Sequence, residues 1–322
     1  MSRLFLYFVS ACLYSILAQA APAPLPSGNN GIAASYPGDA NIQSHPDVLF
    51  FDGFDSYTSN SQLTGSGNWH NFYQNGNIAF DLAVLYSGTK ALRFTMPQSA
   101  SEVSNAVVKT ISPSQDKLHV RACTRYQPNY SGVNSAHNGI RITANYTGPG
   151  RRPNGSDFFL VNVENSRYQG EGEPGYTHVY VYHPEQNDVY GEHWYPSGLT
   201  SNGDGPNGGF GPDFVSRQNV IPARGAWLCH ELMVQANTPG ARDGRIAIWE
   251  NGTLLADFQS IRFRDIGTVK INEIQLENGG QGSTQSNQKW YDNVVVAKSY
   301  IGPMSSGGPT SPAAPTNLRI AP

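Results

Sequence analysis

Two stretches of this sequence place polar and aromatic side chains at every second position. Residues 118–126 contain one such set, and its members are His119, Arg121, Cys123 and Arg125. Residues 176–183 contain another, and its members are Tyr176, His178, Tyr180 and Tyr182. Because successive side chains of a β-strand point to opposite faces, each set shares one face of a sheet. Two arginines are too polar for a dry core, so we expect the arginine-bearing face to be open.

An arginine, a histidine and a tyrosine on one open face could carry out β-elimination on a uronic-acid polysaccharide. In that reaction a cation or amide neutralises the C6 carboxylate, a base removes the C5 proton, and an acid protonates the departing glycosidic oxygen. His137 and Arg141 add a further histidine and arginine between the two stretches. A packing role is the alternative for each residue, since rows of tyrosines also stabilise sheets through cross-strand contacts.

The elements that would position these residues are short strands. Eleven segments have strand-like polarity, and Gly, Pro and Asn signals separate them. These segments are residues 48–51, 91–95, 107–111, 118–126, 139–144, 157–164, 177–183, 227–235, 245–250, 269–277 and 289–297. The pattern predicts an all-β fold, a two-sheet antiparallel β-sandwich. Residues 184–224 form the one long connection, and its aromatic content favours an ordered, functional loop.

Two turns in the last third of the chain carry strong local signals. The string "NTPGARDG" favours a turn that joins residues 232–235 and 245–249 in a hairpin. The pair Asn251-Gly252 is typical of a two-residue hairpin loop, so the chain should then return through residues 254–258.

The two ends of the chain differ in composition from the middle. Residues 1–20 contain Arg3, an apolar run and a small-residue site, which together predict a secretory signal peptide and a secreted, extracellular protein. Residues 21–45 predict a flexible Pro/Gly/Ser-rich leader, residues 46–303 the folded domain, and residues 304–322 a Gly/Ser/Pro linker tail. No other apolar run approaches membrane length, so we expect no membrane contact after signal cleavage.

Cysteine and asparagine usage fit an exported protein. Signal cleavage removes Cys12 and leaves Cys123 and Cys229, for which we expect one disulfide, with two buried thiols as the alternative. Four N-x-S/T sequons would carry glycans on surface loops in a eukaryotic host. They begin at Asn129, Asn145, Asn154 and Asn251.

Charge and composition restrict the class of molecule that the protein is expected to bind. The net charge is −3 and only 14% of residues are charged, which argues against nucleic acid as a partner. A weakly charged surface rich in aromatic and amide side chains suits polysaccharide, because rings stack on sugars and amides bind hydroxyl groups. We expect a monomer without an organic cofactor.

The last third of the chain resembles the closing strands of a concanavalin-A-like β-jelly roll. The resemblance rests on "WLCHELMVQANTPGARDG", "INEIQLENGG" and "WYDNVVVAKSYIGP", with a weaker N-terminal match at "VLFFDGFDS". Within this fold the chain resembles secreted polysaccharide lyases of the alginate and glucuronan lyase kind. The resemblance covers about two thirds of the mature chain.

That resemblance implies roles for individual residues. Arg121 would neutralise the carboxylate, His137 would act as neutraliser or base, and Tyr180 would act as base and acid. The sequence departs from the alginate lyases in lacking intact "Q-I-H" and "R-x-E-x-R" strings. We expect the substrate to contact further residues, which are Arg125, Arg141, His178, Tyr182 and Trp194.

Two other functions and a metal site stay open at this stage. The chain could be a noncatalytic carbohydrate-binding or adhesion module, or a jelly-roll glycoside hydrolase that uses Glu231 with Glu277. If the first and last strands pair, a structural Ca²⁺ could bind their carboxylates, although these would equally serve to cap turns. The carboxylates are those of Asp52, Asp55 and Asp292.

Overall fold

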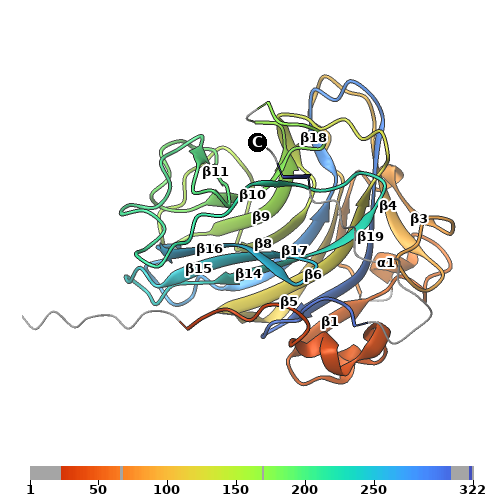
Figure 1. Cartoon of the computed structure of the whole chain (residues 1–322), viewed down its shortest axis with the longest axis horizontal. Helices are drawn as coiled ribbons and strands as arrows, with labels where there is room; N and C mark the ends of the chain where they lie inside the picture. The colour runs from red at the N-terminus through yellow and green to blue at the C-terminus, as the bar shows by residue number, and fades with distance from the viewer. Residues whose placement is uncertain (1–22, 66–67, 169, 306–318, 321–322) are drawn as a thin grey trace, which may run out of the picture.

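The computed structural model describes residues 23–65, 68–168, 170–305 and 319–320, which form two antiparallel sheets packed face to face (Figure 1). Sheet A comprises β1 (Val48–Asp52), β3 (Ile78–Asp81), β4 (Ala91–Met96), β6 (Lys117–Tyr126), β14 (Trp227–Gln235), β15 (Gly244–Glu250), β16 (Thr253–Ile261) and β19 (Asn287–Ala297). Its strand order is β16-β15-β14-β6-β19-β4-β3, and β1 pairs with β19.

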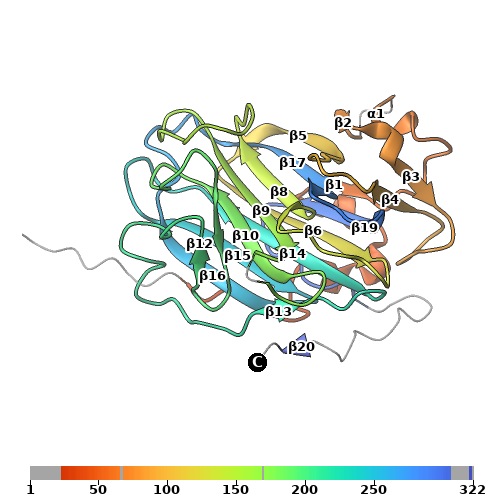
Figure 2. The ribbon, with the colours of Figure 1, turned by 90° about the horizontal axis from the view of Figure 1, so that it is seen from above.

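Sheet B faces sheet A across the core. It comprises β2 (Asn71–Tyr73), β5 (Ala106–Gln115), β8 (Ile140–Ala144), β9 (Phe159–Ser166), β10 (Tyr176–Tyr182), β11 (Glu192–Trp194), β12 (Thr200–Ser201) and β17 (Ile271–Glu277). Its order is β12-β11-β10-β9-β8-β17-β5-β2. In Figure 2, β12 lies on one side of the molecule and β2 on the opposite side. The predicted all-β sandwich is therefore confirmed.

The remaining elements are short. Two small ladders pair β7 (Ser135–His137) with β18 (Gly279–Gln281) and β13 (Val220–Ile221) with β20 (Arg319–Ile320). The helical turns are η1 (Ile32–Ser35), η2 (Pro37–Asp39), η3 (Ile42–Ser44), α1 (Gln62–Gly65) and η4 (Asn75–Asn77). Among the described residues, no helix has the length and apolar character needed to cross a membrane.

Strand alternation fills the space between the sheets. Val120 of β6 and Leu232 of β14 point inward from sheet A and pack in one cluster with Val161 of β9 and Val179 of β10 from sheet B. Each fully buried side chain of this size contributes roughly 1.5–3 kcal/mol. The intervening residues of the same strands point to the outer faces, and this alternation decides where polar side chains gather.

Both predicted hairpins form. Strands β14 and β15 pair with Leu232 opposite Ile248, and β16 continues the sheet from β15. The turn between β15 and β16 holds Asn251 at φ 49° and Gly252 at φ 78°. Only glycine, with asparagine and aspartate to a lesser degree, adopts this left-handed conformation readily, which explains why Asn-Gly directs the chain back.

The predicted disulfide is present. Cys123 of β6 and Cys229 of β14 lie directly opposite each other in sheet A and are bonded. It closes a long loop, because 106 positions separate the two cysteines in the sequence. In the chain-entropy model, the bond therefore stabilises the fold by restricting the unfolded chain.

The structure places residues 23–45, expected to be a flexible leader, against sheet A. Ile32 and Ile42 are buried beside Val295 and Ile301 in an apolar cluster, and the indole of Trp249 donates a hydrogen bond to the Pro26 carbonyl at 2.9 Å. Figure 1 shows these N-terminal turns beside β1. The predicted signal peptide, including Cys12, and most of the predicted tail lie outside the described residues.

A lysine of sheet A is buried. Lys289 of β19 is 1% exposed, and its Nζ donates hydrogen bonds to the Tyr126 hydroxyl at 2.9 Å and to the Asn138 carbonyl. Burial penalises the ammonium form and lowers the pKa of Lys289 well below its usual value. A neutral amine still satisfies both acceptors with its two N–H groups.

We expect this lysine to make the stability of the protein rise with pH. In the unfolded chain this lysine stays protonated up to about pH 10.4. In the folded chain it loses its proton at a lower pH, so between the two pKa values only the unfolded chain carries this proton. The free energy of unfolding therefore rises with pH in that window. Urea unfolding at about pH 7 and about pH 9 should show this rise in the parent protein and a smaller one in Lys289→Met. The exposed control Lys298→Met should match the parent, and equal slopes in all three proteins would disprove the assignment.

Candidate functional site

Sheet B carries polar and aromatic side chains on the face turned away from sheet A. Because Val179 and Val181 of β10 point into the core, their neighbours on the strand point outward. The register brings Tyr180 opposite Asn162 of β9 and opposite His193 of β11. His137 of β7, which is outside sheet B, lies against the same face through Tyr180 and Glu164. We call this set the sheet B cluster, and its members are His137, Arg141, Asn162, Glu164, His178, Tyr180, Tyr182, His193 and Glu277.

Only two members of the sheet B cluster are more than slightly exposed. Seven of its members are at most 8% exposed. His137 and Arg141 are the exceptions, with side chains that are 26% and 11% exposed. A solvent molecule or ligand that approaches the cluster therefore meets His137 and Arg141 first.

Two carboxylates and an amide join the cluster into one network. The guanidinium of Arg141 lies 2.8 Å from Glu277 Oε1. Nδ2 of Asn162 donates to Glu164 Oε2 at 2.8 Å and to Glu277 Oε2 at 3.0 Å. The shared amide holds both carboxylates in place, as buried charges require partners. Burial raises the pKa of Glu277 despite the opposing charge of Arg141.

His137 is held by Glu164. Nδ1 of His137 lies 3.3 Å from Glu164 Oε2. Burial alone would lower the pKa of His137, but the hydrogen bond and the negative charge of Glu164 outweigh it and raise the pKa. Burial would raise the pKa of Glu164, but the neighbouring His137 and His178 bring it down to about 2.

Tyr180 lies beside His137 with its hydroxyl in a fixed orientation. The two ring centroids are 5.3 Å apart. The Tyr180 Oη accepts the Gly191 N–H at 3.0 Å and donates to the Tyr182 hydroxyl at 3.3 Å. Burial and the neighbouring Tyr182 raise the pKa of Tyr180 far above its usual value. Tyr180 therefore keeps its proton at neutral pH.

Glu164 also faces two histidines on its other side. Nε2 of His178 lies 3.5 Å from Glu164 Oε1, and Nδ1 of His193 lies 3.8 Å from it. The two imidazole nitrogens are 2.9 Å apart. Burial, followed by the charge of His178, lowers the pKa of His193 to about 3, so this ring is neutral.

No protein-family model matches this chain, and none of the curated proteins does. Among solved structures, it is similar to a variant of alginate lyase Aly36B in complex with alginate trisaccharide, with 16% identity, a TM-score of 0.58 and coverage of 80% of this chain and 100% of that one. Another is endo-β-1,4-glucuronan lyase from Trichoderma reesei, with 14% identity, a TM-score of 0.51 and coverage of 78% and 96%. It is also similar to the alginate lyase from Aplysia kurodai, with 15% identity, a TM-score of 0.53 and coverage of 78% of this chain and 99% of that one.

The chain has the β-jelly-roll fold of these polysaccharide lyases. This confirms the resemblance inferred from the sequence at the level of the fold, because identities of 14–16% carry the architecture and not the chemistry.

Arg121 does not join His137 and Tyr180, contrary to the predicted convergence. Strand β6 belongs to sheet A, so its polar face points away from sheet B. The N-terminal turns cover that face: the Arg121 guanidinium is paired with the buried carboxylate of Asp39 and donates to the Gly302 carbonyl at 3.1 Å. The expected open face is thus a buried, charge-paired interface. The role inferred for Arg121 has no support in this geometry.

Two predicted substrate contacts are also placed elsewhere. Arg125 shares the outer face of sheet A with Arg121 and lies opposite Trp227 and Trp290 in the register. Trp194 is fully buried in the core, because strand alternation on β11 turns it inward where His193 turns outward. The other predicted contacts, Arg141, His178 and Tyr182, lie in the sheet B cluster.

Three members of the cluster were not predicted as site residues, and Glu277 was predicted only as the partner of Glu231 in the hydrolase alternative. The three are Asn162, Glu164 and His193. Asn162 and Glu164 alternate with valines in "LVNVEN", a pattern of the same kind that singled out the tyrosines of β10. His193 lies in the long connection, where polar and apolar residues do not alternate. Only the pairing of β11 with β10 shows that His193 belongs to the cluster.

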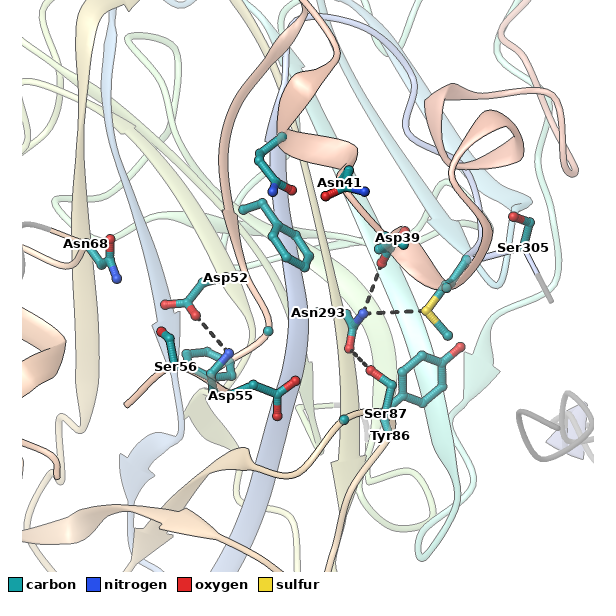
Figure 3. A pocket seen from close by; sticks show the side chains of 18 residues that line it. Asp39, Asn41, Asp52, Asp55, Ser56, Asn68, Tyr86, Ser87, Asn293 and Ser305 are labelled. Atoms are coloured by element: carbon teal, nitrogen blue, oxygen red, sulfur yellow. Dashed lines mark hydrogen bonds between the residues drawn. The ribbon is translucent and has the colours of Figure 1, made fainter. Parts of the chain in front are cut away.

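The aspartates proposed for calcium lie near the pairing of β1 with β19 that the prediction required. Asp52 and Asp55 line a cavity of about 530 Å³ together with Asp39 and Asn293 (Figure 3). Asp292 does not line it, although Asp292 and Asn293 both contact Ser87, because an irregular register and a left-handed φ of 46° at Asn293 interrupt the alternation of β19 there.

These carboxylates already accept hydrogen bonds. Asp52 Oδ1 accepts the Phe54 amide at 2.8 Å, and Asp55 Oδ1 accepts the Thr89 amide at 2.6 Å. Asp292 Oδ2 accepts two backbone amides at 3.1 and 3.2 Å. This is the turn-capping arrangement that was the alternative. Calcium binding stays a prediction from the sequence.

Proposed function

We propose that this protein is a polysaccharide lyase that cleaves a uronic-acid-containing chain by β-elimination at the sheet B cluster. One observation carries the proposal: His137 of β7 lies over the face of sheet B that carries Tyr180 and Arg141, which gathers a base, an acid and a cation. The fold shared with solved alginate and glucuronan lyases supports it by analogy.

His137 is the base in this proposal. We assign the proton on its Nδ1 to the hydrogen bond with Glu164, which leaves Nε2 with a lone pair. A carboxylate that fixes the tautomer of a histidine and stabilises its protonated form is the arrangement that serves general bases in other enzymes. The partly exposed ring can reach a sugar bound over the cluster.

Tyr180 is the acid, because its raised pKa keeps its hydroxyl protonated. The C5 proton of the uronate moves to His137 Nε2, and the C5–H electron pair forms the C4=C5 double bond. The C4–O bond breaks, and the departing glycosidic oxygen takes the proton of Tyr180. Proton exchange with water then restores both residues. Each cleavage of the polysaccharide yields one new reducing end and one unsaturated non-reducing end.

Arg141 is the carboxylate-binding cation, in the place that sequence reasoning gave to Arg121. Its guanidinium is only partly exposed and is oriented by Glu277. The C5 proton is only weakly acidic while the substrate carboxylate carries its negative charge. Neutralising that charge makes the proton easier to remove. We further propose that the protein is secreted, which residues 1–20 and the disulfide support.

A retaining glycoside hydrolase is the second candidate, favoured by the pair Glu164 and Glu277. The two carboxylates accept hydrogen bonds from one Asn162 nitrogen, at 2.8 and 3.0 Å. Their pKa values move in opposite directions, upward for Glu277 by burial and downward to about 2 for Glu164. Retaining glycosidases use such a pair as acid and nucleophile, with the carboxyl groups ~5 Å apart. The predicted pair of Glu231 with Glu277 does not form, because Glu231 contacts His119 on sheet A.

One assay separates these functions. The protein is incubated with alginate, glucuronan and neutral β-glucans, and both ultraviolet absorbance of unsaturated product and new reducing ends are followed. A lyase raises both signals on a polyuronate, whereas a hydrolase raises reducing ends without absorbance. Retention on a polysaccharide with neither signal would identify a carbohydrate-binding module and would refute both enzymatic proposals.

A further inference from the structure

A compact group of three metal-ligand side chains lies within the sheet B cluster. Glu164, His178 and His193 each offer one ligand atom, and these atoms all lie within 4.8 Å of one another. Among the residues that the structure describes, no other group of histidine, cysteine, aspartate and glutamate side chains meets this criterion. All three residues are at most 2% exposed.

The spacing of the three ligand atoms suits a tetrahedral ion. Bonds of about 2.0–2.1 Å from Zn²⁺ to nitrogen or oxygen place neighbouring ligand atoms roughly 3.4 Å apart. The separations here are 2.9 Å between the two imidazole nitrogens and 3.5 and 3.8 Å from these nitrogens to Glu164 Oε1. Small shifts of the side chains would bring all three to the required distance.

The surroundings already orient two of the three ligands, His178 and Glu164. Nδ1 of His178 lies 2.9 Å from the Tyr176 carbonyl, which can only accept, so this nitrogen carries the proton and Nε2 presents its lone pair. Histidine ligands of metals usually have such a partner for their second nitrogen. Glu164 is anchored through Oε2 by Asn162, whereas no hydrogen-bond donor reaches its buried Oε1. A buried carboxylate oxygen without a donor is costly unless a cation binds it.

We propose that Glu164, His178 and His193 bind a divalent first-row transition metal ion, with Zn²⁺ as the best fit. Two imidazoles and one carboxylate are ligands that suit Zn²⁺ and not Ca²⁺, which prefers six to eight oxygens. Three protein ligands leave a fourth position for water or a substrate oxygen. The inference rests on the three side chains alone and holds whether or not the protein is a lyase.

Metal binding can be measured without any polysaccharide. The full chain without an affinity tag is treated with chelator, dialysed, and titrated with ZnCl₂ in a calorimeter at neutral pH. We expect one ion per chain, and a lower affinity by at least about 100-fold in Glu164→Gln and His193→Ala. The control His70→Ala removes a histidine of the opposite edge of sheet B, whose Nδ1 accepts the Thr110 amide, and should bind Zn²⁺ as the parent does.

A second measurement protects the test against misfolded variants. Co²⁺ added to the parent protein should give the intense visible absorption of a tetrahedral site, and Zn²⁺ should displace it. Near-ultraviolet circular dichroism of both variants checks that their packing is native. Absence of Zn²⁺ binding to the parent, a weak octahedral Co²⁺ spectrum, or unchanged binding in natively folded variants would each overturn the proposal. In that case the histidines serve as a buried hydrogen-bonded pair.

Discussion

Tyr180→Phe lowers kcat/KM on the polyuronate by about 10²–10⁴-fold, the contribution typical of a general acid. The substitution removes one hydroxyl and leaves the ring beside His137 in place. Binding should change little, so the loss should fall on kcat. The product assay under Proposed function measures it, on whichever polyuronate the parent protein cleaves.

Tyr182→Phe is the matched control for that experiment. Tyr182 lies on the same strand and face, and its hydroxyl contacts that of Tyr180 at 3.3 Å. In our assignment it orients Tyr180 without transferring a proton, so its loss should cost roughly 10-fold or less, the equivalent of about one hydrogen bond. Equal losses in the two variants, or full activity in Tyr180→Phe, would exclude Tyr180 as the acid. His137→Gln should match Tyr180→Phe in severity, because elimination also fails without a base.

The sequence predicted the parts of the fold that depend on local signals. The turn at Asn251-Gly252 needs a left-handed backbone, and the residues themselves reveal this requirement. Alternation likewise assigned Tyr180 and His178 to one face and Val179 to the other. Pairing of Cys123 with Cys229 was predicted because both lie in strand-like segments of an exported chain.

The sequence could not predict which sheet a strand joins. Alternation shows that Arg121 and Arg125 share a face, but not whether that face looks toward substrate or toward residues 23–45. The answer comes from the pairing of β6 between β14 and β19 and from an aspartate more than eighty residues earlier in the chain. The prediction that Trp194 contacts the substrate was wrong for a related reason. A strand of only three residues is too short to show an alternation of polar and apolar residues, so its inward face cannot be predicted.

The ion pair that misled the sequence reasoning should be among the most important contacts for stability. Arg121 and Asp39 are 1% exposed each, and Arg121 joins sheet A to the N-terminal turns and to Gly302. Removal of one partner from a buried pair leaves an uncompensated charge and typically costs about 3–5 kcal/mol. We therefore expect Arg121→Met to lose that much free energy of unfolding.

Urea unfolding of Arg121→Met measures this loss, and two further variants decide its origin. Arg151→Met breaks an exposed pair with Asp157, in which the arginine side chain is 45% exposed, and should cost only about 0–1 kcal/mol. Adding Asp39→Asn to Arg121→Met removes the stranded charge, and asparagine tolerates the left-handed φ of 58° at that position, so part of the lost stability should return. Below its unfolding transition, Arg121→Met should keep the activity of the parent per folded molecule. A loss of activity without a loss of stability would return Arg121 to the catalytic site and contradict the placement of β6 in sheet A.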